Sequence, residues 1–247
     1  MKKSFILIIA CLLSFCSFSQ RSTELYNKGV KQAKKGNYEK AIRFFTKAII
    51  LYPYFKEAYY NRALAKSKQG NYAEAIADYS NAIRIAPDFS PAYNNRGADR
   101  KELNDLEGAL EDYSKAIELD PGYAMAYYNR GVAEFLQVDF DAAVRDFTKA
   151  CNLNSSDPDA FFNKALAELK LLDHANAIKD LSTAIELRPA FATAYKKRGM
   201  AFYETGSYSR ALTDYKKALD LQSDDGELQT LIAQAELKLT TAVSKSQ

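Results

Sequence analysis

The hexapeptide AYYNRG at residues 126–131 has close copies elsewhere in the chain. AYYNRA stands at 58–63, AYNNRG at 92–97 and AYKKRG at 194–199, so the copies are separated by 34 residues or by twice that number. A fixed period in this range is the sequence signature of a repeat architecture. The chain is therefore predicted to be built from repeats of one small structural unit.

The prolines fix the register of this repeat. Pro53, Pro87 and Pro121 are also 34 residues apart, and when proline is taken as position 32, every unit has Ala at positions 20 and 27 and Gly or Ala at position 8. Each unit contains two apolar runs at helical spacing, often separated by a turn such as Gly36-Asn37. Each unit is therefore predicted to be a helical hairpin. The six predicted units are 22–55, 56–89, 90–123, 124–157, 158–191 and 192–225.

This pattern of small and large residues resembles the tetratricopeptide repeat (TPR) over residues 22–225. The resemblance implies an all-α fold, a right-handed superhelical solenoid of six TPR helix-turn-helix repeats, in which the first helix of each hairpin (the A helix) lines a concave face. Residues 226–243 carry an apolar stripe and are predicted to form the C-terminal capping helix that such an array needs. Val138 and Leu172 stand where Gly or Asn would turn the chain more easily, so we expect these two hairpins to turn differently.

The first 19 residues have the pattern of a signal peptide. A basic start, the apolar run FILIIACLLSF and small residues before Gln20 predict cleavage and export, to the periplasm of a bacterial envelope or to the medium. The alternative is a lipid anchor at Cys11 or Cys16. The run is short for a membrane span, and no second apolar stretch of spanning length follows, so no membrane span is predicted.

The composition gives no sign of catalysis. The formal charge of +3 includes Lys2 and Lys3, which leaves 3 − 2 = +1 after cleavage, too balanced to suggest nucleic acid as a partner. His174 is the single histidine and occupies a position that is mostly aromatic elsewhere; Cys151 occupies an aliphatic one. Both are interpreted as packing residues. Since no phosphate loop, metal-binding motif or nucleophile motif appears, we predict no catalytic residue, no metal and no cofactor.

Four units have arginine at position 7, for example Arg96, and two interpretations of this residue are open. Five units carry aspartate at position 23, for example Asp112, and the two positions come close together in an antiparallel hairpin. The first interpretation is an ion pair across each hairpin. The second is that both side chains extend separately to water.

The asparagines at position 6 are the strongest functional signal. Asparagine costs a helix about 0.5–0.7 kcal/mol relative to alanine, so five of them in A helices need a reason. In the TPR family position 6 faces the concave groove, and the resemblance implies an asparagine ladder that binds the backbone of an extended peptide. Duplication of one ancestral repeat, without a binding role, is the alternative. The predicted peptide-binding residues are Asn27, Asn61, Asn95, Asn129 and Asn163, the aromatic residues Tyr26, Tyr60, Tyr128 and Phe162, and the basic pair Lys196 and Lys197.

The sequence thus predicts a non-enzymatic protein-protein interaction module that binds an extended peptide segment of another protein in its concave groove. A structural scaffold or assembly factor of an outer-membrane or secretion complex, binding through convex or edge surfaces, is the alternative. A small-ligand sensor or an enzyme would instead need a closed pocket with converging polar groups.

Overall fold

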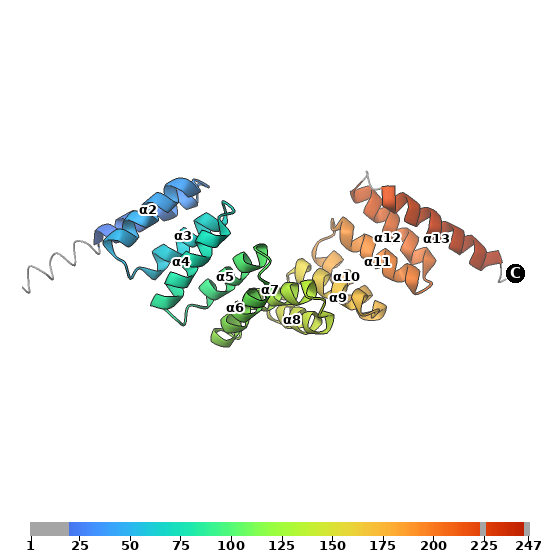
Figure 1. The fold of residues 1–247 in the computed structure, drawn as a ribbon. Helices are drawn as coiled ribbons and strands as arrows, with labels where there is room; N and C mark the ends of the chain where they lie inside the picture. The colour runs from blue at the N-terminus through green and yellow to red at the C-terminus, as the bar shows by residue number, and fades with distance from the viewer. Residues whose placement is uncertain (1–19, 223–225, 245–247) are drawn as a thin grey trace, which may run out of the picture. The chain divides into compact units, whose positions relative to one another are not determined.

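The computed structural model describes residues 20–222 and 226–244. The predicted signal peptide, with Cys11 and Cys16, lies outside these residues. Every regular element of the described residues is a helix (Figure 1). None of the described helices is both long enough and apolar enough to cross a membrane.

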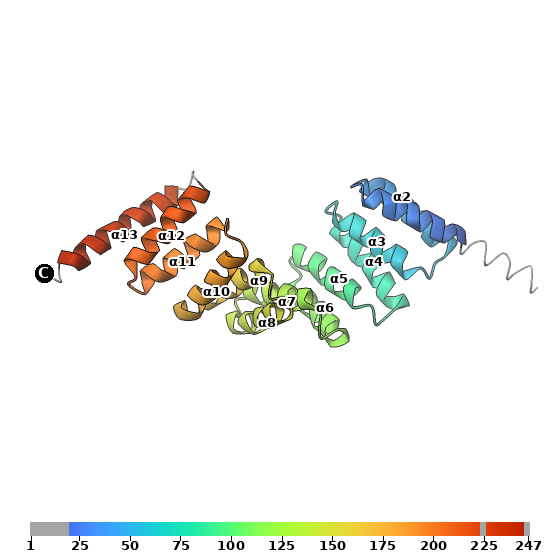
Figure 2. The same ribbon diagram turned by 180° about the vertical axis from the view of Figure 1, so that it is seen from behind.

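The helices form two compact units, the first ending at Pro121 and the second beginning at Gly122. In each unit consecutive helices pack as antiparallel pairs, which can be followed from both sides in Figures 1 and 2. The first unit contains helical residues 20–33, α2 (Tyr38–Leu51), α3 (Lys56–Ser67), α4 (Tyr72–Ile85), α5 (Ser90–Glu102) and α6 (Leu106–Leu119). The second contains α7 (Ala124–Leu136), α8 (Phe140–Leu153), α9 (Pro158–Lys170), α10 (His174–Leu187), α11 (Ala192–Glu204), α12 (Tyr208–Leu221) and α13 (Gly226–Ser244).

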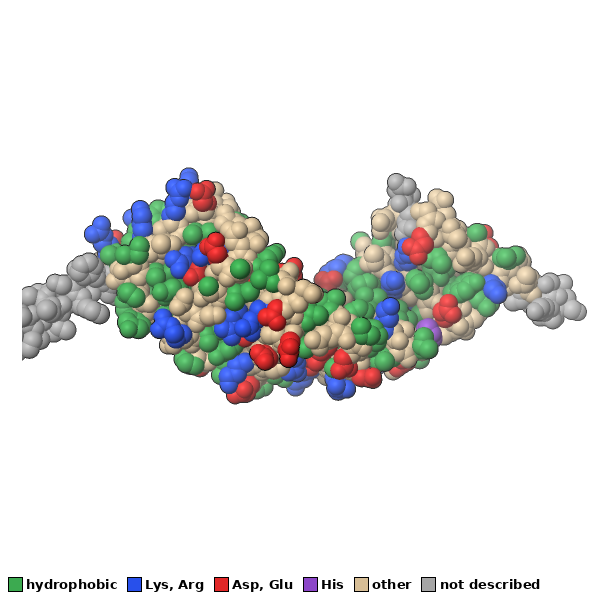
Figure 3. Space-filling view, viewed as in Figure 1, with side chains coloured by type: hydrophobic (Ala, Val, Ile, Leu, Met, Phe, Trp, Pro, Cys, Tyr) green, Lys and Arg blue, Asp and Glu red, His purple; other side chains and the backbone are tan. Residues whose placement is uncertain are grey.

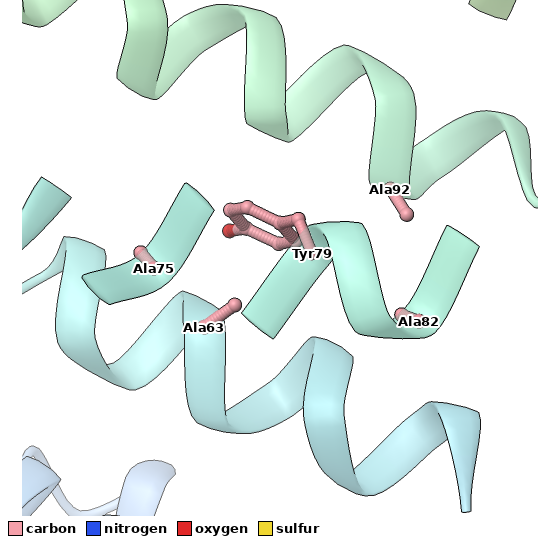
Figure 4. Packing of buried hydrophobic residues seen from close by; sticks show 5 residues of the cluster. All are labelled: Ala63, Ala75, Tyr79, Ala82 and Ala92. Atoms are coloured by element: carbon pink, nitrogen blue, oxygen red, sulfur yellow. The ribbon is translucent and has the colours of Figure 1, made fainter. Parts of the chain in front are cut away.

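A large side chain at position 24 fills the space between the two helices of each hairpin. Tyr79 of α4 is buried, and its ring lies among the small side chains of Ala63, Ala75 and Ala92 (Figure 4). In the next hairpin a Cβ atom added to Gly97 would lie 2.9 Å from the ring of Tyr113. The small residues are therefore required because the large ring leaves no room for more.

The turns between paired helices share one backbone geometry. Gly70 has a φ of 79°, while Val138 and Leu172 have φ values of 66° and 61°. Helix α3 ends with the hydrogen bond Asn71 N to Lys66 O at 3.0 Å, and α7 ends with the equivalent bond from Asp139 N to Glu134 O, also 3.0 Å. The expectation that the hairpins at Val138 and Leu172 turn differently is thus wrong. Helix pairing imposes the left-handed residue, and these side chains adopt it at a cost in strain.

The fifth hairpin begins with a capped helix. Asp157 caps α9 by accepting a hydrogen bond from the backbone N of Asp159 at 3.0 Å, and Pro158 occupies the first turn. At the other end of the chain, α13 packs on α12 and buries Leu228 and Ala235. Leu228, Leu231, Ile232 and Ala235 of the predicted apolar stripe therefore lie on the face of α13 that covers the last hairpin.

Candidate functional site

All predicted site residues lie on A helices. We call the surface of these helices the A-helix face; it consists of residues 20–33, α3 and α5 in the first unit and of α7, α9 and α11 in the second. Each unit presents its own part of this face. On the side of the molecule seen in Figure 3, hydrophobic side chains are mixed with basic and acidic ones in both units. The side chains at positions 5 and 6 lie at the junction between the A helix of one repeat and that of the next.

Tyrosine at position 5 and asparagine at position 6 of the following repeat form a hydrogen bond, which we call a Tyr–Asn bridge. Within each unit, the amide nitrogen Nδ2 donates to the hydroxyl oxygen Oη of the tyrosine one repeat earlier. The bridges are Asn61 to Tyr26 at 3.0 Å, Asn95 to Tyr60 at 2.8 Å and Asn163 to Tyr128 at 2.8 Å. The asparagines therefore join neighbouring repeats, a role that the sequence did not indicate.

The remaining hydrogen-bonding capacity of a bridge can be counted. Asn61 Nδ2 also donates to the carbonyl oxygen of Glu57 at 2.8 Å, and Asn163 Nδ2 to that of Asp159 at 2.9 Å. Both amide hydrogens are thus used inside the chain, and the acceptor Oδ1 is left. Burial raises the pKa of Tyr128, so its hydroxyl keeps the hydrogen that it has not used. Each such bridge offers one acceptor and one donor.

The other predicted residues have different surroundings. Asn27 belongs to the first repeat and is exposed, and Asn129 is half-buried on α7. Lys196 forms an ion pair with Glu227 of α13 at 2.7 Å. The ring of Phe162 packs against that of Phe191, with centroids 4.8 Å apart.

The bridges stop at the last A helix of the second unit. Lys197 occupies position 6, where the preceding A helix has Asn163, and Phe162 occupies position 5, where α7 has Tyr128. Phenylalanine has no hydroxyl to accept a hydrogen bond. Both members of the bridge are thus replaced together, and Lys197 instead lines a pocket.

This pocket of about 340 Å³ lies in the second unit, between A helices α7, α9 and α11 and the start of α10. Its walls include the apolar side chains of Phe135, Leu169 and Met200. Sequence reasoning found Lys197 but missed the pocket, because its walls come from four helices. Its polar lining consists of Lys170, His174, Lys197 and Glu204.

Of the two interpretations of the residues at positions 7 and 23, the ion pair across the hairpin is confirmed. Arg96 Nε donates to Asp112 Oδ2 at 2.9 Å and Arg96 Nη2 to Asp112 Oδ1 at 2.6 Å. Arg96 Nη1 also donates to Ser80 Oγ of the preceding B helix at 2.9 Å, and its guanidinium lies 5.5 Å from the centroid of the Tyr93 ring. One arginine thus links three helices. Equivalent pairs join Arg62 to Asp78, Arg130 to Asp146, Lys164 to Asp180 and Arg198 to Asp214.

Position 11 reverses its charge between the two units. In the first unit it is basic at Lys66 and Arg100, and Arg100 lies 3.0 Å from Asp112. In the second unit it is acidic at Glu134 and Glu168, beside the aspartates of their own hairpins. Burial, with repulsion from Asp146, raises the pKa of Glu134 to about 7. Burial, with repulsion from Asp180, likewise raises the pKa of Glu168.

Two further observations bear on chemistry. Cys151 is buried in α8, as predicted for a packing residue, and burial raises the pKa of its thiol to about 12. Within residues 20–222 and 226–244, no group of three or more His, Cys, Asp or Glu side chains could hold a metal ion.

The sequence matches family descriptions of the tetratricopeptide repeat at residues 22–55, 57–89 and 162–226, and a further TPR repeat at 100–138. Together these ranges cover more than half of the chain. No match was found among curated proteins.

Solved structures of similar proteins share this architecture. MamA is 27% identical, with 65% of this chain and 94% of that chain covered and a TM-score of 0.63. PilF of Pseudomonas aeruginosa is 18% identical, with 88% and 99% covered and a TM-score of 0.76. YrrB, described as a TPR protein with an unusual peptide-binding site, is 22% identical, with 78% and 97% covered and a TM-score of 0.66. With the helical hairpins, these matches support a protein-interaction module, and the chain belongs to the tetratricopeptide-repeat family.

Proposed function

We propose that the A-helix face binds an extended segment of another protein. The observation that carries this proposal is the series of Tyr–Asn bridges. In the bridges Tyr26–Asn61 and Tyr128–Asn163, the hydroxyl keeps a hydrogen to donate and Oδ1 keeps its capacity to accept. An extended backbone presents N–H and C=O groups at regular intervals, which such a donor and acceptor can satisfy without reading the side chains.

The bridges also make the face rigid. An asparagine held by a tyrosine on one helix and a carbonyl on its own helix has little rotational freedom left to lose on binding. Preorganisation of this kind improves affinity because less entropy is lost. The structural likeness to YrrB adds that this fold can carry a peptide site.

Binding through an edge of the second unit is a second candidate. Val138 and Leu172 occupy equivalent turns and are 69% and 75% exposed, and Leu136 and Leu171 beside them are also exposed. Exposed aliphatic side chains at strained turns are therefore candidates for contact with a partner. This surface corresponds to the scaffold alternative.

Site-specific photocrosslinking distinguishes the two candidates. p-Benzoylphenylalanine would be placed at Leu64 or Leu166 on the A-helix face, at Val138 on the edge, and at the exposed Lys47 or Lys179 on B helices as controls. We expect one protein to crosslink from the A-helix positions and not from the others. Crosslinks from Val138 alone would assign the function to the edge.

We further propose that the chain is exported and works in a bacterial cell envelope or outside the cell. The proposal rests on the signal-peptide pattern of residues 1–19. Mass spectrometry of the native protein is expected to find an N-terminus near Gln20. An intact Met1 would contradict export, and a lipid on Cys11 or Cys16 would replace cleavage by anchoring.

A further inference from the structure

The pocket between α7, α9 and α11 has a mixed lining. Phe135, Leu169 and Met200 supply an apolar wall, and its volume of about 340 Å³ lies at the lower end of the range for ligand pockets. That volume suits one large side chain better than a whole folded element. The polar groups at the pocket then decide which neighbours this side chain can have.

The lysines of the pocket carry uncompensated charge. In the described part of the chain, no carboxylate lies within ion-pair distance of Lys170 or Lys197, although Lys196 is paired with Glu227. Lys197 is unpaired because it replaces the asparagine of a Tyr–Asn bridge where Phe162 replaces the tyrosine. The bridge has been lost at the position where a cation is presented.

His174 adds an unsatisfied polar atom. Its Nδ1 is buried and has no hydrogen-bond partner within the described residues, although a buried polar atom without a partner costs free energy. Glu204, which occupies the same repeat position as Lys170, is the single acidic residue of the lining. Two lysines against one glutamate favour an anion at this pocket.

We propose that this pocket binds a bulky hydrophobic side chain of the partner segment, with an acidic residue on each side of it. The inference rests on the proposed function, since it assumes that an extended segment crosses the A-helix face. Lys170 belongs to α9 and Lys197 to α11, the next A helix. A segment that crosses from one to the other meets an ammonium group before and after the pocket. This arrangement favours acidic side chains on both sides over a single chain terminus.

The methionines provide a direct test. The chain has three, of which Met200 lines the pocket and Met125 is exposed on α7. Full-length protein labelled with methyl-13C methionine would be titrated with short Gly/Ser peptides, blocked at both ends, that carry Glu-Leu-Glu, Gln-Leu-Gln, Lys-Leu-Lys or Glu-Ala-Glu at the centre. We expect Glu-Leu-Glu to shift the Met200 signal saturably and to bind about tenfold more tightly than Gln-Leu-Gln.

Matched variants locate the effect. Lys170→Gln combined with Lys197→Gln should remove the preference for Glu-Leu-Glu over Gln-Leu-Gln, while Lys179→Gln, on the exposed side of a B helix, should keep it. Equal binding of the Glu and Lys peptides, or an unmoved Met200 signal at millimolar peptide, would overturn the proposal. Tighter binding of a peptide that ends in Leu with a free carboxylate would overturn it in favour of a chain terminus.

The test also separates the two proposals. If a partner crosslinks at Leu64 and Leu166 while the pocket shows no preference for acidic peptides, the A-helix face keeps its function and only the pocket assignment fails. If crosslinks come from the edge alone, the proposed function itself fails, and the pocket assignment loses the premise on which it rests.

Discussion

Arg96 and Asp112 form a two-point ion pair across the third hairpin, with nitrogen–oxygen distances of 2.9 and 2.6 Å. Their side chains are 15% and 3% exposed. Removal of Asp112 leaves Arg96 without its carboxylate in a place that water reaches poorly, whereas removal of Arg96 leaves Asp112 with Arg100 at 3.0 Å. This geometry makes a definite prediction about stability.

Asp112→Asn should lower the free energy of unfolding by about 2–4 kcal/mol. Arg96→Gln should lower it by less, because Arg100 still pairs with Asp112, and the double variant should lose less than the sum. We expect a coupling energy of about 1–3 kcal/mol from urea unfolding followed by circular dichroism. The matched control is Arg43, whose pair with Glu39 is 72% and 73% exposed. Arg43→Gln should stay within about 0.5 kcal/mol of the parent. A coupling energy of zero would mean that the buried pair contributes no more than the exposed one.

Val138→Gly should stabilise the protein. The side chain is largely exposed, so little packing is lost, while a φ of 66° strains a β-branched residue. Relief of about 1–3 kcal/mol of strain exceeds the roughly 0.5–1 kcal/mol that glycine costs in chain entropy. We expect a gain of about 0.5–1.5 kcal/mol in urea unfolding.

The reverse change is the control for this prediction. Gly70 has a φ of 79° and open space around its Cα, so Gly70→Val should lower stability through backbone strain alone. If Val138→Gly were destabilising instead, the exposed valine would have to make a contact that the strain argument omits.

Most of the fold could be predicted from the sequence because the repeat multiplies a weak signal. One Ala at position 20 says little, but Ala41, Ala75 and Ala109 in register fix the place where two helices touch. The turns at Val138 and Leu172 could not be predicted in this way. Local preference argues against a left-handed valine, and only the packing of the hairpin overrides it. The boundary after Pro121 is also invisible in the sequence, since the repeat continues across it in register.

Asn95→Ala and Asn27→Ala should change stability in opposite directions. Helix propensity alone favours alanine at both sites by about 0.5–0.7 kcal/mol. Asn95 also donates to Tyr60 across the repeat junction at 2.8 Å, whereas Asn27 lies in the first described hairpin and is exposed. Loss of a half-buried hydrogen bond costs about 1 kcal/mol or more. Asn27→Ala should therefore be slightly stabilising and Asn95→Ala slightly destabilising, with a difference of about 1 kcal/mol in thermal or urea unfolding.

An equal gain in both variants would show that the bridge contributes nothing to stability. Tyr60→Phe gives an independent measurement, because it removes the acceptor and keeps the ring. This variant should lower the free energy of unfolding by about 1 kcal/mol, the contribution expected of the hydrogen bond.

The candidate site was only partly predictable for a related reason. Position and residue type indicated that Asn61 and Tyr26 matter, but sequence spacing within one repeat cannot show that they bond to each other across two repeats. The pocket at Met200 and His174 could not be predicted from the sequence, because its lining residues come from four helices, α7, α9, α10 and α11. What the sequence did contain was the joint replacement of Asn by Lys197 and of Tyr by Phe162. That signal is interpretable only once the bridge is known.

Stability should fall as the pH rises from about 5 to 8. Glu134 holds its proton in the folded chain up to a pKa of about 7, while the unfolded chain releases it near 4.5. The folded state therefore binds more protons in this window, and the free energy of unfolding decreases with pH. Burial and repulsion from Asp146, which is paired with Arg130, both oppose a negative charge at Glu134. Glu134→Gln should flatten the dependence by about 1–3 kcal/mol between pH 5 and 8, measured by urea unfolding at each pH.

The exposed Glu107→Gln, in the first unit, should leave the parent slope intact. The same slope in Glu134→Gln and in the parent would show that this carboxyl is ionised in the folded protein throughout the window.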